Sequence, residues 1–254
     1  MRLTVLGTGS AMPVSDRAQT GYLLEADGDD RRLLLDCGAG TLGRLAGTDA
    51  GYEGVSTVLL SHHHLDHVAD LLPLLKARWL AGETDLTVVG PPGTRELVEG
   101  LLDVHDYLRG RMDLTLRDLA VEADGANDWE RSTFEVAGFE VAAFETRHSM
   151  QCFAYRFGDL TVSGDSEAYE GLAAFADGSQ VLLHDCSFPD GVDVDNHPTP
   201  TQLGRVLAGH EVDRLYLTHL YPHTEGRHAE MVDAVRDRFD GDVRVASDGL
   251  RIEV

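Results

Sequence analysis

Cysteine, lysine and long apolar runs are scarce in this chain of 254 residues, and each shortage narrows what the protein can be. The three cysteines, Cys37, Cys152 and Cys186, are an odd number without CxxC spacing, which argues against a disulfide framework and favours small core residues in a reducing compartment. No stretch reaches the ~20 apolar residues of a membrane span, and the first apolar run is too short for a signal peptide. We therefore expect a cytoplasmic protein without membrane association.

Positive charge is also in short supply. Lys76 is the only lysine, and 21 basic residues against 44 acidic ones give a net charge of −23. The acidic residues are spread along the chain and do not form a tail. Such a surface suits concentrated salt, because screening over roughly 3 Å at 1 M salt suppresses self-repulsion. The composition predicts a salt-adapted, halophilic protein and argues against a general nucleic-acid-binding surface.

The chain is long enough to bury a large core, and on length alone one domain is as plausible as two. Strands are predicted at residues 2–7, 21–26, 32–36, 56–60 and 85–89, and again at 134–136, 139–146, 152–157, 160–163, 180–184, 214–218, 243–246 and 250–254. Helices are predicted to end near 46, 108 and 176 and to cover 68–80, 201–209 and 227–239. The opening strand meander excludes a doubly wound fold that begins βαβ.

The two halves of the chain, about 1–130 and 131–254, have similar patterns of a strand meander followed by strand–helix units. We expect a single domain over 1–254 in which two sheets face each other with helices outside, because this buries both runs of strands. The predicted fold class is α/β (α+β), a four-layer αβ/βα sandwich of two mixed β-sheets. Residues 109–131 are the least regular part and are predicted to be a loop with a short strand, a substrate-gating role being the alternative.

The densest cluster of chemically active side chains is Ser61-His62-His63-His64-Leu65-Asp66-His67. It follows an apolar strand and precedes a predicted helix. In extended backbone His62 and His64 point to one side and His63 points away, while Asp66 stands where a helix N-cap belongs and His67 projects from the first turn. Three imidazoles and a carboxylate suit a metal such as zinc, although a histidine-rich surface loop is the alternative.

Other motifs accompany this cluster along nearly the whole chain. Gly7-Thr8-Gly9-Ser10 lacks the spacing of a phosphate loop and is predicted to be a tight turn near the site. The chain also contains Leu35-Asp36-Cys37-Gly38-Ala39-Gly40, a later His148, Ser163-Gly164-Asp165-Ser166, and Thr218-His219 at a strand end. Together with this turn and the His-x-His-x-Asp-His cluster, these motifs resemble those of the metallo-β-lactamase fold superfamily, in its ribonuclease Z-like branch.

The resemblance implies a binuclear metal site. One ion would be bound by His62, His64 and His148. The other would be bound by Asp66, His67 and His219, and Asp165 would bridge the two. Two divalent ions about 3.5 to 4 Å apart need a shared anion and an open position for hydroxide. Histidine-rich ligation favours Zn²⁺, although Mn²⁺ or Fe²⁺ could occupy such a site.

The implied reaction is phosphodiester hydrolysis, in which metal-activated hydroxide attacks phosphorus in line. We expect Asp66 to be a catalytic residue as well as a metal ligand. In ribonuclease Z relatives, Glu-Ala-Thr and His-Ser-Thr loops supply a carboxylate and a histidine that protonate the leaving alkoxide. Here the matching positions are Asp185-Cys186-Ser187 and His197-Pro198-Thr199, so His197 is the candidate general acid and Asp185 its orienting partner, a structural role for the pair being the alternative.

The substrate is less determined than the chemistry. The glycine- and proline-rich basic arm with which ribonuclease Z grips transfer RNA has no counterpart here, which favours small or cyclic phosphodiesters over the alternative, transfer RNA 3′-processing endonuclease activity. A thioester hydrolase would normally add a C-terminal helical domain, and a β-lactamase would carry an export signal. A non-catalytic metal-binding or RNA-associating module is the alternative from another class. Relatives are often dimers, so a homodimer is expected by resemblance alone.

The remaining histidines receive plainer interpretations. His63 and His184 are predicted to support the ligands or to pack, and His223 to line the pocket or lie outside it. Surface or capping positions on helices are predicted for His105, His210 and His228.

Overall fold

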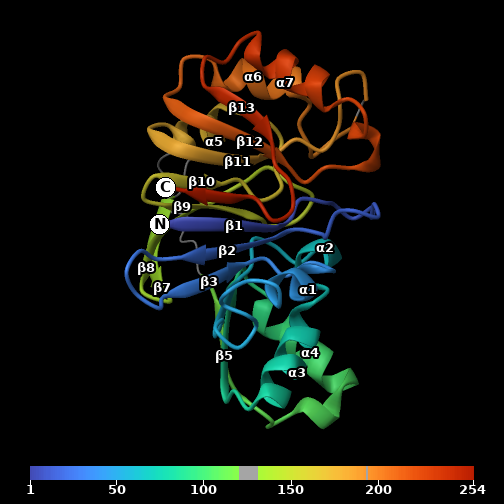
Figure 1. Ribbon diagram of the computed structural model, residues 1–254, viewed down its shortest axis with the longest axis vertical. Coiled ribbons are helices and arrows are strands. Elements are labelled where there is room, and N and C mark those ends of the chain that lie inside the picture. Colours follow the sequence, from blue (N-terminus) through green and yellow to red (C-terminus); the bar gives the residue numbers. More distant parts are fainter. Residues whose placement is uncertain (120–130, 193) are drawn as a thin grey trace. The chain divides into compact units, whose positions relative to one another are not determined.

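The computed structural model describes residues 1–119, 131–192 and 194–254, and its contacts divide the chain into two compact units (Figure 1). Unit 1 comprises Met1–Gly7, Ser15–Ala120 and Asp248–Glu253. Unit 2 comprises Thr8–Val14, Val121–Ser247 and Val254. Each unit thus borrows a short segment from the other half of the sequence. A single domain of two halves meeting near residue 130 stays a prediction.

Unit 1 contains one seven-stranded mixed sheet, in the order β14-β1-β2-β3-β4-β5-β6. Its antiparallel part consists of β14 (Arg251–Glu253), β1 (Arg2–Gly7), β2 (Gly21–Glu25) and β3 (Arg32–Leu35). The parallel part continues from β3 through β4 (Thr57–Leu59), β5 (Asp85–Gly90) and β6 (Asp113–Asp118). The predicted opening meander is therefore confirmed, and the strand–helix units that follow it form the parallel part.

The helices of unit 1 lie between these strands in sequence: α1 (Thr41–Leu45), α2 (Leu65–Val68), α3 (Leu71–Ala81), α4 (Thr94–Val104) and the 3₁₀ turn η1 (Asp106–Leu108). Their apolar residues pack with the strands into one core, and Trp79 packs against it as expected. The fully buried guanidinium of Arg78 donates to the carbonyl oxygens of Tyr52, Glu53 and Asp85 at 2.7–3.0 Å. Burial lowers the pKa of Arg78, and the three carbonyls accept from its two terminal nitrogens, whereas its buried Nε has no hydrogen-bond partner among the described residues.

Unit 2 repeats the same plan in the order β13-β12-β11-β10-β9-β8-β7. The antiparallel meander is β7 (Arg131–Val136), β8 (Phe139–Glu145), β9 (Phe153–Phe157) and β10 (Leu160–Val162). The parallel strands β11 (Ser179–Asp185), β12 (Val212–Thr218) and β13 (Asp242–Val245) follow. Two mixed sheets with helices confirm the predicted α/β class.

The helices of unit 2 are α5 (Glu170–Ala176), α6 (Pro200–Leu207), the 3₁₀ turn η2 (Pro222–Thr224) and α7 (His228–Arg236). Helix α6 begins with a capping box between Thr199 and Gln202 and has Pro200 in its first turn, both of which favour a sharp start. Residues of α6 and α7 share a core with β11, β12 and β13. No helix within the described residues is long and apolar enough to cross a membrane.

Helix α2 begins earlier in the sequence than expected. Its N-cap is His64 and its first residue is Leu65, so Asp66 is not the N-cap and its carboxylate lies in the first turn. Within 109–131, the expected short strand is β6, while residues 120–130 lie outside the described residues.

Candidate metal centre

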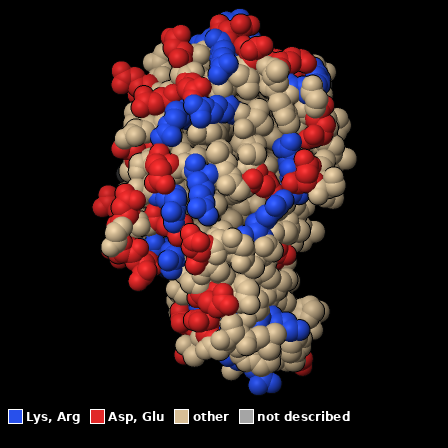
Figure 2. All heavy atoms as spheres, in the orientation of Figure 1, with Lys and Arg blue, Asp and Glu red and all other residues tan. Residues whose placement is uncertain are grey.

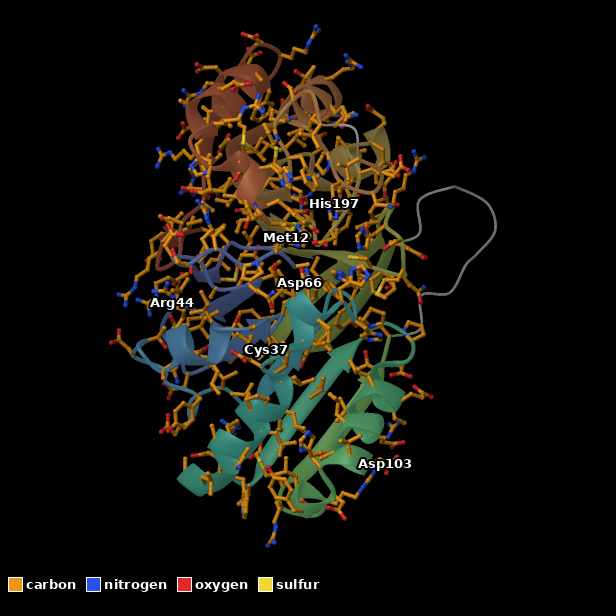
Figure 3. All side chains as sticks on the ribbon, turned by 90° about the vertical axis from the view of Figure 1, so that its right-hand side faces the viewer. Met12, Cys37, Arg44, Asp66, Asp103 and His197 are labelled. Carbon is orange, nitrogen blue, oxygen red and sulfur yellow. The ribbon has the colours of Figure 1, made fainter. Side chains whose placement is uncertain are left out.

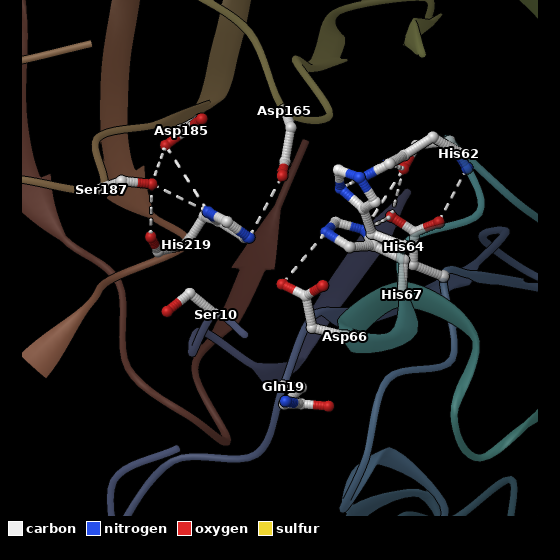
Figure 4. Close-up of polar contacts among 12 residues, drawn as sticks. Ser10, Gln19, His62, His64, Asp66, His67, Asp165, Asp185, Ser187 and His219 are labelled. Atoms are coloured by element: carbon white, nitrogen blue, oxygen red, sulfur yellow. Dashed lines mark hydrogen bonds and ion pairs between the residues drawn. The ribbon is translucent and has the colours of Figure 1, made fainter. Parts of the chain in front are cut away.

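The segment 61–67 of unit 1, which we call the histidine loop, brings four of the predicted ligands together at the carboxyl end of β4. His62 Nε2 and His64 Nδ1 lie 3.1 Å apart, and the His62 and His67 rings have centroids 4.1 Å apart. Asp66 projects from α2 (Figure 3), and its Oδ2 lies 3.8 Å from Nε2 of His67 (Figure 4). The loop therefore places three imidazoles and one carboxylate together within unit 1.

A carboxylate not predicted as part of the site orients this loop. Buried Asp36 accepts from the backbone N–H of Ser61 at 2.7 Å, from its hydroxyl at 2.8 Å, and from His67 Nδ1 at 2.8 Å. The hydroxyl of Ser61 in turn lies 3.1 Å from His62 Nδ1. These contacts assign the proton of His62 and of His67 to Nδ1, which makes Nε2 the lone-pair nitrogen of each ring.

The backbone after Asp36 docks directly on α2. Cys37 N–H donates to the carbonyl of His67 at 2.7 Å, and Asp70 N–H donates to the carbonyl of Cys37 at 2.9 Å. A Cβ atom at Gly38 would stand 2.0 Å from the carbonyl oxygen of Asp66. Only glycine allows this close approach, so the Cys37-Gly38 segment fixes the helix that carries Asp66 and His67.

Unit 2 brings together the other three predicted ligands. Asp165 Oδ2 lies 3.3 Å from His219 Nε2 and 3.8 Å from His148 Nε2, so its carboxylate stands between the two rings. The hydroxyl of Thr146 donates to the Asp165 carbonyl at 2.8 Å, tying the end of β8 to the loop after β10. Nδ1 of His148 lies 3.4 Å from the carbonyl of Asn196, which leaves Nε2 as the nitrogen facing Asp165.

A second buried carboxylate orients histidines in unit 2. Asp185 Oδ2 accepts from His197 Nδ1 at 2.7 Å, and its Oδ1 accepts from the Ser187 hydroxyl at 2.6 Å. His219 Nδ1 donates to the same hydroxyl at 2.9 Å (Figure 4), so Nε2 of His219 carries the lone pair. The expected pair Asp185 and His197 thus lies together, and Ser187 joins it to His219.

The pKa values agree with this geometry. Burial opposes ionisation of Asp185, but the neighbouring His197 and His219 outweigh it and lower the pKa of Asp185 to about 2. For His197, burial lowers the pKa, and the attraction and hydrogen bond of Asp185 reverse this so that the pKa is raised. His197 precedes α6 (Figure 3) and lines a cavity of about 310 Å³ together with Glu167, Asn196, Gln202 and Arg205.

Backbone strain is concentrated at the same positions. Among the described residues, four that are not glycine have positive φ: Asp36 (60°), Ala137 (50°), Asn196 (67°) and His219 (57°). Three of these belong to the networks described above. Such a conformation costs of order 1–3 kcal/mol for a residue other than glycine, and it persists where surrounding contacts over-determine it. At Asp36 and His219 those contacts are the hydrogen bonds of the buried carboxylate networks.

Several residues have supporting positions, and some of these were not anticipated. Asp36 and Ser187 were missed as site residues; the available signal was a polar residue directly after a buried strand. His63 points to Thr94, with Nε2 2.8 Å from its hydroxyl, and burial lowers the pKa of His63. His184 is buried and its Nδ1 donates to the Asp185 carbonyl at 2.7 Å. These two positions agree with the supporting or packing role predicted for them.

The glycine turn lies beside the unit 2 ligands, and the three cysteines are buried. Thr8, in the Gly7–Ser10 turn, accepts at its carbonyl from the N–H of Leu220, the neighbour of His219, at 2.8 Å. The turn is therefore beside the unit 2 cluster, as predicted. Cys37, Cys152 and Cys186 are buried, and burial raises the pKa of the Cys37 and Cys186 thiols well above the usual value.

The chemistry of the donors fits divalent metal ions. In unit 2, Asp165, Asp185, His197 and His219 each offer a ligand atom, and these atoms lie within 4.8 Å of one another. In unit 1, the facing nitrogens of His62 and His64 form a comparable pair. Imidazoles fixed as one tautomer by outer carboxylates, together with further carboxylates, are the ligand type that zinc and similar dications prefer.

Comparison with solved structures identifies the fold. The metallo-β-lactamase fold protein YhfI from Bacillus subtilis matches with a TM-score of 0.82, at 24% identity over all of this chain and 99% of that one. The short form of human tRNase Z matches with a TM-score of 0.76, at 20% identity over 100% and 99%. Ribonuclease Z from Mycobacterium avium is 32% identical over the whole chain and 98% of its own length.

The fold, the oriented donors and these relatives define a metal-dependent hydrolase of the metallo-β-lactamase fold, in the ribonuclease Z-like branch. A narrower assignment follows from a family model that matches residues 1–234. The chain belongs to the family described as anti-Pycsar protein Apyc1.

Proposed function

We propose that this protein is a binuclear metal-dependent phosphodiesterase that acts on small or cyclic phosphodiesters. The observation that carries the proposal is the pair of buried networks, Asp36 with Ser61 and Asp185 with Ser187, which hold imidazoles of both units in one tautomer. Such outer partners orient and strengthen metal-binding histidines, and they have little purpose around unliganded surface imidazoles.

Seven side chains would hold the two ions. His62, His64 and His148 would bind one, Asp66, His67 and His219 the other, and Asp165 would bridge them. When bound, the ions lower the pKa of a coordinated water and neutralise charge on the phosphoryl oxygens. We propose Zn²⁺ as the resident metal because imidazole nitrogens predominate among the ligands.

The chain itself supplies a proton to the leaving group. Asp185 accepts from Nδ1 of His197, fixing the ring and favouring its charged form, so Nε2–H is the donor available to a leaving alkoxide. Ser187 holds Asp185 in place from its other oxygen. Proton transfer to the alkoxide leaves a neutral imidazole, which Asp185 keeps in the tautomer that can accept a proton again at Nε2.

The charge of the chain favours a small substrate. A net charge of −23 repels a polyanion, and affinity for RNA depends mainly on neutralising many phosphates. Figure 2 shows acidic side chains beside the basic ones on the face drawn there. The alternative, transfer RNA 3′-processing, is supported by relatives named ribonuclease Z and tRNase Z. We further propose that the protein works in the cytoplasm at high salt.

Hydrolysis of bis(p-nitrophenyl) phosphate in high-salt buffer tests the reaction. We expect turnover by the metal-loaded protein, loss of turnover in Asp66→Ala, and a partial loss in His197→Ala. Matched controls are Asp103→Ala and His210→Ala, which remove an exposed aspartate and a histidine that pairs with Glu170, both outside the site. Activity that survives in Asp66→Ala, or no turnover with two metals bound per chain, would contradict the proposal.

The substrate class requires a second comparison. The same enzyme preparation would be offered a cyclic nucleotide and a precursor transfer RNA, and the two values of kcat/KM compared. We expect the cyclic nucleotide to be preferred. A preference for precursor transfer RNA would instead favour the endonuclease alternative.

A further inference from the structure

The histidine loop contains four histidines, and three of them are predicted ligands. The fourth, His63, stands in sequence between His62 and His64, whose facing nitrogens lie 3.1 Å apart (Figure 4). The ring of His63 instead contacts the start of α4, where its Nε2 lies 2.8 Å from the hydroxyl of Thr94. A side chain between two ligands, with a partner of its own, fixes the backbone from which both ligands project.

A second contact of Thr94 determines the direction of this hydrogen bond. The Thr94 hydroxyl donates its only hydrogen to the carbonyl of Pro91 at 2.8 Å. It therefore accepts from His63, whose Nε2 must carry a proton, whereas His62 and His67 carry theirs on Nδ1. Thr94 is buried. Breaking the contact would leave a buried acceptor and its donor unsatisfied, so the pair resists separation.

The sheet of unit 1 holds the acceptor in place. A Cβ atom at Gly90, the last residue of β5, would stand 2.5 Å from the Thr94 hydroxyl oxygen and 3.0 Å from Cβ of Leu60. Glycine at this position therefore lets the start of α4 approach the residue that precedes the histidine loop. The carboxylate of Asp118 in β6 accepts from the N–H of Arg95 at 2.9 Å, which ties the first turn of α4 to the next strand.

His64 is the ligand that depends most on this contact. The buried carboxylate network of unit 1 acts on the rings of His62 and His67. His64 directly follows His63 and is the N-cap of α2, with extended backbone at φ −62° and ψ 150°. Anchoring His63 fixes the peptide that joins it to His64, so the histidine loop is held at a second place.

We propose that His63 is a positioning residue for the metal ion that His62 and His64 would bind, an inference that rests on the proposed binuclear function. Through Thr94 it holds the backbone in the conformation that presents both imidazoles, which reduces the ordering required when the ion binds. Loss of this hydrogen bond should weaken the binding of that ion and affect the other ion less.

Removing either partner tests the contact. His63→Phe keeps a ring and loses the donor, and Thr94→Val keeps the shape and loses the acceptor. In each variant, competition with a chelator should show that zinc affinity falls about 10-fold for one of the two ions, the lower end of the range for outer partners of metal-binding histidines. His63→Gln can donate from the position of Nε2, and Thr94→Ser keeps the hydroxyl, so both should recover most of the affinity.

A double-mutant cycle distinguishes this hydrogen bond from general damage to the loop. If the two side chains act through one contact, the variant with both His63→Phe and Thr94→Val should lose no more zinc affinity than either single variant. Additive losses, or wild-type affinities in both single variants, would overturn the inference. If Thr94→Val fails to fold, His63→Phe and His63→Gln decide, because His63 is only half-buried.

Thr48→Val is the matched control in unit 1. The hydroxyl of Thr48 donates to the carbonyl of Leu45 at 2.7 Å, outside the histidine loop. Its loss should lower the free energy of unfolding of the metal-free protein and leave zinc affinity unchanged. Denaturant unfolding of every metal-free variant measures this structural effect separately from metal binding.

Zinc affinity is measured without turnover, so the two proposals can fail separately. If the wild-type protein binds two zinc ions and hydrolyses no phosphodiester, the proposed function fails, and the variants still decide the role of His63. If hydrolysis occurs and His63→Phe binds both ions as tightly as the wild type, the function stands and the positioning inference fails. A wild-type protein that binds no zinc would overturn both.

Discussion

In both units a buried aspartate and a serine orient histidines, but the histidines that they orient have different proposed roles. In unit 1, Asp36 and Ser61 fix His62 and His67, both candidate ligands. In unit 2, Asp185 and Ser187 fix one candidate ligand, His219, and one proposed proton donor, His197.

This difference predicts separable functions. The unit 1 network should govern metal affinity alone, because both rings it holds are ligands. The unit 2 network should govern metal affinity and proton transfer together. Equivalent substitutions in the two units can therefore distinguish binding from chemistry.

The largest effect is expected from Asp185→Asn. An amide keeps the shape but cannot favour the charged form of His197, so kcat at saturating metal should fall by about 10²-fold or more, the scale of general acid catalysis. Steady-state kinetics across a metal titration provides the measurement. A kcat restored to the wild-type value by excess metal would show that Asp185 acts on metal binding only.

The corresponding substitution in unit 1, Asp36→Asn, should have a different signature. Asn tolerates the positive φ of Asp36, so the backbone is preserved while the acceptor for His67 weakens. Metal affinity should fall about 10- to 100-fold, as is typical for outer partners of metal-binding histidines. Competition with a chelator measures the affinity, and the kcat of the fully loaded variant should be near that of the wild type. A large drop in that kcat would contradict the proposal that the unit 1 network governs metal affinity alone.

Gly38→Ala should lower stability because the new Cβ would overlap the carbonyl oxygen of Asp66. Displacing α2 should cost about 1–3 kcal/mol in the free energy of unfolding, the range for overpacking. Gly43→Ala in α1 is the matched control, since a Cβ there meets nothing within 4 Å. Denaturant unfolding of the metal-free proteins gives both values. Equal stabilities would show that the close approach at Gly38 is not required.

The smallest effects are expected from Ser61→Ala and Ser187→Ala. Each removes one hydroxyl from a buried network and should cost about 1 kcal/mol of stability. Ser61→Ala should weaken metal binding a few-fold at unchanged kcat, whereas Ser187→Ala should lower both. Steady-state kinetics gives kcat and competition with a chelator gives metal affinity for both variants. Identical behaviour of the two variants would remove the distinction between the units.

The units also differ in how far their features follow from sequence. The unit 1 ligands lie within six consecutive residues, 62–67, and strand alternation followed by a helix turn suffices to place them together. The helix start was shifted, because His64 and not Asp66 occupies the N-cap of α2, and the helix expected over 68–80 is divided into α2 and α3. The repeated pattern of meander and strand–helix units likewise predicted both mixed sheets.

The unit 2 cluster depends on chain topology. His148, Asp165, His197 and His219 come from four loops that only the strand order of the sheet makes neighbours, so resemblance to a family was needed to select them. Asp36 and Ser187 were missed because a residue that supports a ligand has no spacing of its own. Their positions became evident from hydrogen bonds and, for Asp36, from a positive φ.

The most direct test of the binuclear proposal is a zinc titration of the metal-free protein while hydrolysis of bis(p-nitrophenyl) phosphate is followed. We expect the rate to rise until two equivalents per chain are bound and then to level off, with little activity at one equivalent in the limit of tight binding. Full activity at one equivalent, or no activity at two, would contradict the proposal that donors of both units act as one binuclear centre.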